Sequence, residues 1–147
     1  MTTFSGFHEH SIDAKGRMIL PAEYRDAFED GVWVTPEIDR CLALRTEEEF
    51  VAVAAEYDHK AGRGHTQRHA ARLFHARAKE IVPDKHGRMV IPERLRSYAN
   101  LTDRVVVVGF GRRVEIWDAD MWADIEAQAD ASLGGGDQSL DDLPAPP

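Results

Sequence analysis

Hydrophobic and polar positions follow the same order in two separate stretches of the chain. In each stretch a polar turn sequence, DAKGR or DKHGR, leads into a short apolar run at residues 18–20 or 89–91. Apolar runs of this length next to turn residues are typical of short buried β-strands. Each stretch therefore predicts a strand, a turn and a second strand.

The residues that follow predict one short helix and two more strands per stretch. Pro21 and Pro92 stand where a helix would begin, at the first helical position. Two runs rich in apolar residues then follow in each stretch, and Gly109 and Gly111 favour a hairpin between the two runs of the second stretch. The predicted strands lie at residues 32–34, 42–44, 105–108 and 114–117.

A longer helix closes each stretch. Thr46 and Glu49 form a capping box, and Asp118 is the N-cap of the second helix. Between the stretches, residues 58–64 predict a mobile connection and residues 65–80 a helix. That helix has one apolar and one basic face. The basic face consists of Arg68, Arg72, His75 and Lys79. It is either a solvated surface or a second surface for binding DNA.

The two stretches are copies of one another. At an offset of 71, residues 13–25 and 84–96 are identical at six of thirteen positions, and the similarity continues at an offset of 72. Asp-x-x-Gly-Arg is turn chemistry, because Asp accepts backbone N–H bonds and Gly permits positive φ angles. Basic side chains on paired turns suit phosphate contact and base-edge readout. Alternatively, Asp13 with Arg17 and Asp84 with Arg88 are ion pairs that only fix the turns.

Composition narrows the class of protein. The 147 residues suffice for one ordinary domain or two very small ones, and the net charge of −8 excludes a uniformly basic nucleic-acid coat. Nine of the 26 acidic residues follow Arg113 and no Lys or Arg does, so residues 1–113 hold 17 acids against 18 bases. The single Cys41 excludes an internal disulfide and a Cys-rich metal cluster. No membrane span and no secretory signal are expected, which fits the cytoplasm.

From Phe4 to Ala129 the sequence resembles the MraZ proteins, which are bacterial transcriptional regulators. The segment FSGFHEHSIDAKGRMILPAEYR and the second D-x-x-x-R motif carry the resemblance. It implies an α+β fold in which two swapped-hairpin SpoVT-AbrB modules form a split β-barrel with peripheral helices. The implied parts are domain 1 at 7–49, a basic helical connector at 50–77, domain 2 at 78–121, the end of the last helix at 122–131 and a disordered acidic tail at 132–147.

The resemblance also implies a function. The expected partner is double-stranded DNA, at short direct repeats upstream of the division and cell-wall gene cluster and of the protein's own gene. A nucleoid-associated homo-oligomer in the form of a ring would bind there, as a repressor. In copy two His86 stands at the position of Lys15, so copy one is the closer match. The implied DNA-binding residues are Asp13, Lys15, Gly16, Arg17, Asp84, Lys85, Gly87 and Arg88.

Three other functions compete with this one. An enzyme is disfavoured because no nucleophile motif and no phosphate-binding loop is present, so no catalytic residue and no cofactor is expected. A metal site on His65 and His69 or on His8 and His10 is disfavoured because no HExxH-type carboxylate accompanies them. The third is an oligomeric assembly or partner-binding module without DNA binding, in which the tryptophans form an interface rather than a core; they are Trp33, Trp117 and Trp122.

Overall fold

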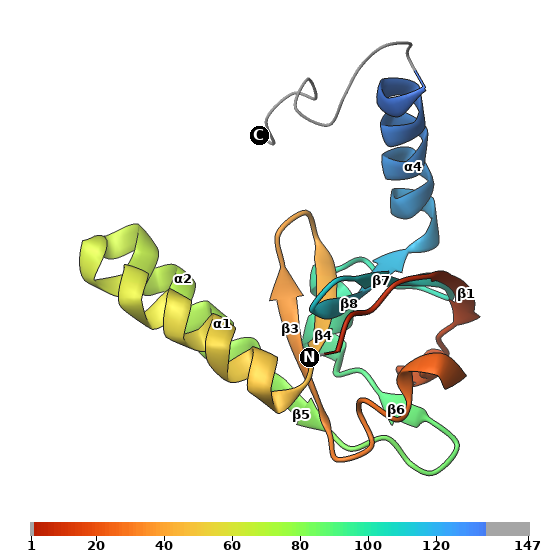
Figure 1. Cartoon of the computed structure of the whole chain (residues 1–147), viewed down its shortest axis with the longest axis horizontal. Helices are drawn as coiled ribbons and strands as arrows, with labels where there is room; N and C mark the ends of the chain where they lie inside the picture. Colours follow the sequence, from red (N-terminus) through yellow and green to blue (C-terminus); the bar gives the residue numbers. More distant parts are fainter. Residues whose placement is uncertain (1, 135–147) are drawn as a thin grey trace.

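The fold is described by a computed structural model that covers residues 2–134 (Figure 1). The first copy contains β1 (Phe7–Ser11), β2 (Arg17–Ile19), the 3-10 helix η1 (Ala22–Tyr24), β3 (Val32–Glu37), β4 (Cys41–Arg45) and α1 (Glu47–Lys60). The 3-10 helix η2 (Ala61–Arg63) and α2 (His65–Arg77) follow. The second copy contains β5 (Lys79–Ile81), β6 (Arg88–Val90), α3 (Glu93–Tyr98), β7 (Arg104–Phe110), β8 (Arg113–Asp118) and α4 (Ala119–Leu133). The element order predicted for each copy is confirmed.

The two copies exchange their first strands. The main sheet has the order β1-β7-β8-β4-β3-β5, so β1 of the first copy pairs with β7 of the second, and β5 of the second pairs with β3 of the first. A separate two-stranded ribbon joins β2 to β6, with Met18 directly opposite Met89. All of these pairs are antiparallel. Pairing of β4 with β8 also joins the copies, so four strand pairings in all link one copy to the other and fold the chain as one α+β body.

The main core lies between the sheet and the ribbon, and both copies contribute to it. Phe28 is fully buried, and the Phe4 ring stacks on it at a centroid distance of 5.2 Å. Met18 and Met89 are buried from the ribbon side. A smaller cluster on the opposite face of the sheet consists of Cys41, Val106, Val108 and Trp117, with Met121, Trp122 and Ile125 of α4 packed against it. The tryptophans thus belong to packed clusters, since Trp33 also stacks on Phe50 at 4.1 Å.

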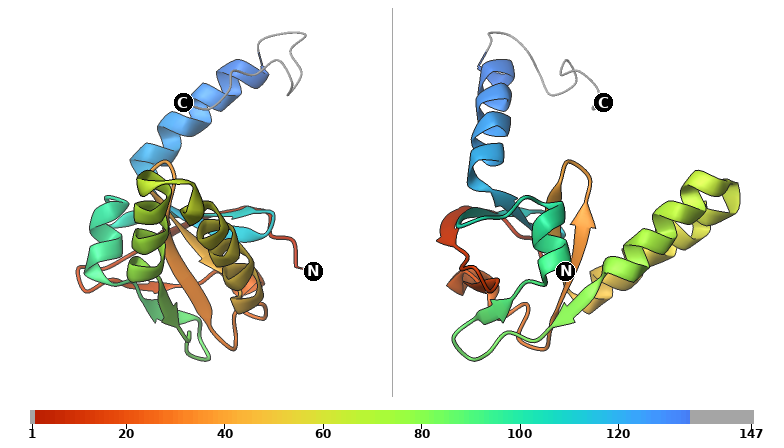
Figure 2. Two further views of the ribbon diagram at one scale, coloured as in Figure 1. Left: turned by 90° about the vertical axis from the view of Figure 1, so that its left-hand side faces the viewer. Right: turned by 180° about the vertical axis from the view of Figure 1, so that it is seen from behind.

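Two helical elements project from the sheet (Figures 1 and 2). The arm formed by α1 and α2 is held at its base by rings of both helices, with Phe74 of α2 stacked on Tyr57 of α1 at 4.3 Å. The Thr46 hydroxyl accepts a bond from the Glu49 N–H at 3.3 Å, which confirms Thr46 as the N-cap of α1. The fourth helix, α4, begins at Asp118, whose carboxylate accepts a bond from the Met121 N–H at 3.2 Å. None of the helices within residues 2–134 combines the length and the apolar character that crossing a membrane requires.

Some predicted boundaries were wrong. The helix expected at 65–80 ends at Arg77, because Lys79 pairs with Val34 as part of β5. The basic face predicted for that helix therefore loses Lys79.

Residues 58–63 are helical rather than a mobile connection, since α1 runs to Lys60 and η2 follows it. Pro21 and Pro92 are N-caps, one residue before their helices. The last helix extends to Leu133, and residues 135–147 of the expected acidic tail lie outside the described residues.

The strand exchange predicts that neither copy folds as a monomer. We expect a fragment of residues 1–77 and a fragment of residues 78–134 to be unfolded alone, because each lacks the partners of its first two strands. Mixed in equal amounts, they should form a folded complex. Far-UV circular dichroism and size-exclusion chromatography of each fragment and of the mixture measure this. A natively folded monomeric fragment would contradict it.

Candidate nucleic-acid interface

The first turn of the repeat is built around one carboxylate. Asp13 Oδ1 accepts bonds from the backbone N–H groups of Lys15 and Arg17, both at 2.9 Å. Asp13 Oδ2 accepts a bond from Arg17 Nε at 2.6 Å. One side chain thus satisfies two backbone donors of the turn and also orients the arginine that follows it.

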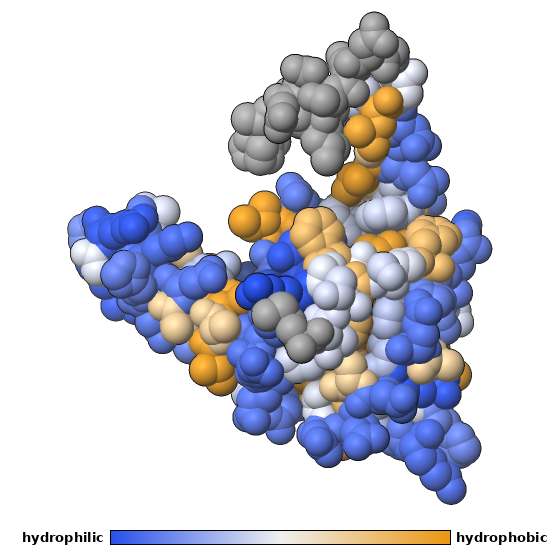
Figure 3. Space-filling view, viewed as in Figure 1, coloured by the Kyte–Doolittle hydropathy of each residue, from blue (hydrophilic) through white to orange (hydrophobic). Residues whose placement is uncertain are grey.

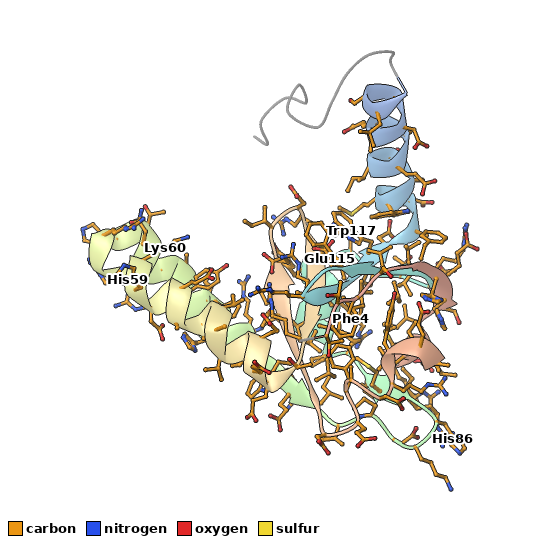
Figure 4. All side chains as sticks on the ribbon, viewed as in Figure 1. Phe4, His59, Lys60, His86, Glu115 and Trp117 are labelled. Atoms are coloured by element: carbon orange, nitrogen blue, oxygen red, sulfur yellow. The ribbon has the colours of Figure 1, made fainter. Side chains whose placement is uncertain are left out.

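The second turn repeats this geometry. Asp84 Oδ1 accepts bonds from the N–H groups of His86 and Arg88, both at 2.9 Å, and Oδ2 accepts one from Arg88 Nε at 2.7 Å. His86 stands at the position that Lys15 occupies in the first turn. The geometry of the turn is the same, because the aspartate bonds the backbone N–H at that position and not the side chain. In Figure 4, His86 lies at the far end of this turn and points away from the body of the protein.

A glycine brings the backbone of each turn against the other copy. Gly16 and Gly87 have φ angles of +84° and +79°, which residues with a Cβ atom rarely adopt. The Gly16 carbonyl accepts a bond from Ile91 N–H, and the Gly87 carbonyl accepts one from Leu20 N–H, both at 2.8 Å. A Cβ atom on Gly16 would overlap the carbonyl oxygen of Ile91. Both glycines therefore allow the backbone of one copy to approach the other closely.

The ribbon places the two turns side by side. Pairing of β2 with β6 puts Arg17 opposite Val90 and Arg88 opposite Ile19. An open groove of about 680 Å³ runs along the ribbon. Both Asp–Arg pairs line it, together with His10 and Ser11 of β1, Ile19 and Val90, and the two ribbon methionines. Figure 3 shows hydrophilic side chains gathered at this end of the molecule.

The arginines are fixed at one end and free to contact a ligand at the other. Their side chains are 63% and 64% exposed. Among the described residues, Arg17 and Arg88 bond protein acceptors through Nε alone, so the terminal nitrogens face solvent. The two roles that the sequence allowed, turn staple and exposed donor, are therefore compatible. Lys15 and Lys85 are exposed beside them.

The hydrogen bonds within each turn lower the pKa of its aspartate. The backbone N–H of Arg88, together with its side chain, lowers the pKa of Asp84 to about 2. The same bonds from Arg17 lower the pKa of Asp13. Both carboxylates are thus ionised at neutral pH and hold their arginines by charge-assisted bonds. Burial, with the nearby charges of His8 and Arg25, lowers the pKa of His10 in the groove.

Two further arginines support the turns, and sequence reasoning assigned them no role. Arg25 Nε donates to the Leu20 carbonyl at 3.0 Å. Arg96 Nε donates to the Ile91 carbonyl at 2.9 Å, and its Nη1 donates to the Ala14 carbonyl at 3.2 Å. Each guanidinium packs against the glycine of the opposite copy. The signal was present, because these are the last identical positions in the thirteen-residue match.

The histidines and the cysteine that the sequence offered as other candidate sites do not form a site in the part of the chain that the structure describes. Within residues 2–134 no three His, Cys, Asp or Glu side chains are placed to share a metal ion. His65 and His69 instead bond Arg68 and Arg72 at 3.0 and 3.2 Å, on the arm. Cys41 is fully buried, and burial raises the pKa of its thiol, which disfavours the reactive thiolate.

Comparison with known proteins agrees with the repeat. The family model described as "MraZ protein, putative antitoxin-like" matches twice, at residues 3–73 and 74–142. A protein of Cutibacterium acnes is 43% identical over 129 residues, which cover 87% of this chain and 91% of the relative. One of Thermobifida fusca is 43% identical, covering 85% and 87%, and one of Paenarthrobacter aurescens is 37% identical, covering 96% and 97%. All three are named transcriptional regulator MraZ.

The pKa of Asp84 gives a testable pH dependence. In the folded protein it is about 2, below the value of about 4 in an unfolded chain. The ionised carboxylate therefore stabilises the turn above about pH 4, and this contribution is lost as the pH falls toward 2. NMR titration of the Asp84 carboxyl carbon measures the pKa directly. A midpoint near 4 would contradict the bonding described here, and Arg88→Gln should raise the pKa only in part, because the Arg88 N–H remains.

Glycine substitution tests the contact between copies. We expect Gly16→Ala to lower the free energy of unfolding by about 2–4 kcal/mol, because it combines an unfavourable φ with overlap at Ile91. Gly62→Ala, on the arm, is the matched control, since no atom lies within 4 Å of its Cβ position. Urea denaturation compares the two variants. Equal stability of both would show that Gly16 is not constrained.

Proposed function

The chain belongs to the MraZ family, and on that basis we propose that it is a sequence-specific DNA-binding transcriptional regulator whose two Asp-x-x-x-Arg turns form a single DNA-contacting surface. The observation that carries the proposal is the β2–β6 ribbon, which presents both turns on one groove. A two-stranded ribbon fits the major groove of B-DNA, which is about 12 Å wide. Arginine is the side chain most often used there to read guanine.

The charge distribution supports the same assignment. The turns carry Lys15, Arg17, Lys85 and Arg88, while the excess of acidic residues lies after Arg113, where α4 projects from another part of the body (Figure 1). A protein with a net negative charge can bind DNA through a local basic surface, because screening limits interactions to about 8–10 Å at physiological ionic strength. The lysines would contact phosphates, and the arginines would contact phosphates or base edges.

We further propose that the protein binds direct repeats in DNA as an oligomer, as the family resemblance implies. One ribbon makes few contacts, so tight binding requires several ribbons on one DNA, as an oligomer or ring bound to direct repeats would provide through effective concentration. The exchange of first strands between copies supports the swapped-hairpin, split-barrel arrangement. We assign the protein to the cytoplasm and nucleoid, as a repressor of its own gene and of the division and cell-wall cluster, with no enzymatic activity.

Fluorescence anisotropy tests the proposal. The labelled duplex is the DNA upstream of the protein's own gene, and a shuffled duplex of equal length is measured beside it at several salt concentrations. We expect tighter binding to the upstream duplex and a steep salt dependence. Equal and weak binding to both duplexes would contradict the proposal and favour an assembly module without DNA binding.

Single substitutions test the arginines. Arg17→Gln and Arg88→Gln should each weaken binding by about 5- to 150-fold where the guanidinium reads a base. Where it contacts a phosphate, the slope of log affinity against log salt should flatten by about 0.9. Arg112→Gln, an exposed arginine in the β7–β8 turn, is the control and should bind like the unsubstituted protein. Unchanged binding by both folded turn variants would overturn the assignment.

A further inference from the structure

Two aliphatic side chains stand exposed among the residues that line the groove along the ribbon. Ile19 is 44% exposed and Val90 is 52% exposed, although Met18 and Met89 beside them are buried. Side chains alternate between the two faces of a strand, so Arg17, Ile19, Arg88 and Val90 share the outer face of the ribbon. The outer face is therefore not uniformly polar, because half of its four side chains are aliphatic.

The aliphatic positions are duplicated along with the arginines. Ile19 and Val90 are equivalent in the two copies, at the offset of 71. Each lies directly opposite the arginine of the other copy, as the pairs Ile19–Arg88 and Val90–Arg17. Directly opposite residues in an antiparallel pair have Cβ atoms about 4.5–5.5 Å apart. The ribbon thus presents the same pair, one guanidinium and one branched aliphatic group, twice.

This combination matches the chemistry of the major groove. Base edges there offer acceptors on guanine, which arginine contacts, and a single apolar group, the C5-methyl of thymine. An aliphatic side chain gains free energy by removing that methyl group from water. No other standard base in DNA presents a methyl group in the groove.

We propose that Ile19 and Val90 are specificity-determining residues that contact thymine methyl groups in the bound DNA. The inference rests on the proposed DNA-binding function and adds to it which base the ribbon reads beside the arginine contacts. The aliphatic side chains contribute sequence preference, whereas Lys15 and Lys85 contribute affinity that is independent of sequence.

Replacing thymine by deoxyuracil tests the proposal, because deoxyuracil pairs identically and lacks only the methyl group. The anisotropy titration is repeated with the upstream duplex and the shuffled duplex, each made with thymine or with deoxyuracil throughout. We expect deoxyuracil to weaken binding to the upstream duplex by about four-fold for each methyl group contacted, or roughly fifteen-fold for two. The shuffled duplex should bind equally in both forms.

Variants of the ribbon locate the effect. The double variant Ile19→Ser/Val90→Ser should bind the thymine duplex more weakly and no longer distinguish it from the deoxyuracil duplex. The exchange Ile19→Val/Val90→Ile keeps two branched aliphatic groups and should retain the preference. Ile38→Ser is the matched control, since Ile38 is 74% exposed in the β3–β4 turn, at the other end of β3 from the ribbon (Figure 1). Thermal unfolding of each variant verifies that the ribbon remains folded.

The possible failures are distinguishable. If the protein prefers the upstream duplex but binds its thymine and deoxyuracil forms equally, the proposed function stands and methyl contact is wrong. A folded serine variant that keeps the full preference would also overturn the inference, because the methyl groups would then be read elsewhere. If the protein does not prefer the upstream duplex, the proposed function fails, and this inference fails with it.

Discussion

Pairing between the two copies is the constraint on which the remainder of the structure depends. The ribbon joins β2 to β6, and the hydrogen bonds from Leu20 to Gly87 and from Ile91 to Gly16 hold each turn against the opposite copy. A stretch of about 45 residues buries too little apolar surface to fold well alone. The exchange of β1 and β5 solves this by making one core from both copies, and the pairing of β2 with β6 brings both Asp–Arg turns to one groove. The stability of the fold and the proposed binding surface therefore both depend on pairing between the copies.

Each aspartate holds the arginine of its own turn in place before any ligand binds. Asp13 and Asp84 each accept three hydrogen bonds, and only one of the three comes from the arginine side chain. The arginine therefore loses little conformational freedom on binding, which lowers the entropic cost of recognition. Arg25 and Arg96 extend this support to the backbone on either side of the turns.

Much of the fold was readable from local signals, and the remainder was not. The repeat, the turns and the element order follow from residue type and spacing, which act over a few residues. Strand partners do not: nothing in the spacing of residues 7–11 indicates that they pair with β7 of the other copy. For the same reason the helix predicted at 65–80 was too long, because only pairing with β3 makes Lys79 extended. Arg25 and Arg96 were visible as repeated positions, but their role requires knowing which glycine lies beside them.

We propose that both turns form one DNA-binding surface. Hydrogen–deuterium exchange with mass spectrometry, with and without the upstream duplex, tests it most directly, because it follows both copies in the intact protein. Peptides covering residues 13–19 and 84–90 are expected to become protected together at the same DNA concentration, while the α1–α2 arm does not change. Protection of the arm alone, or of one turn without the other, would contradict it.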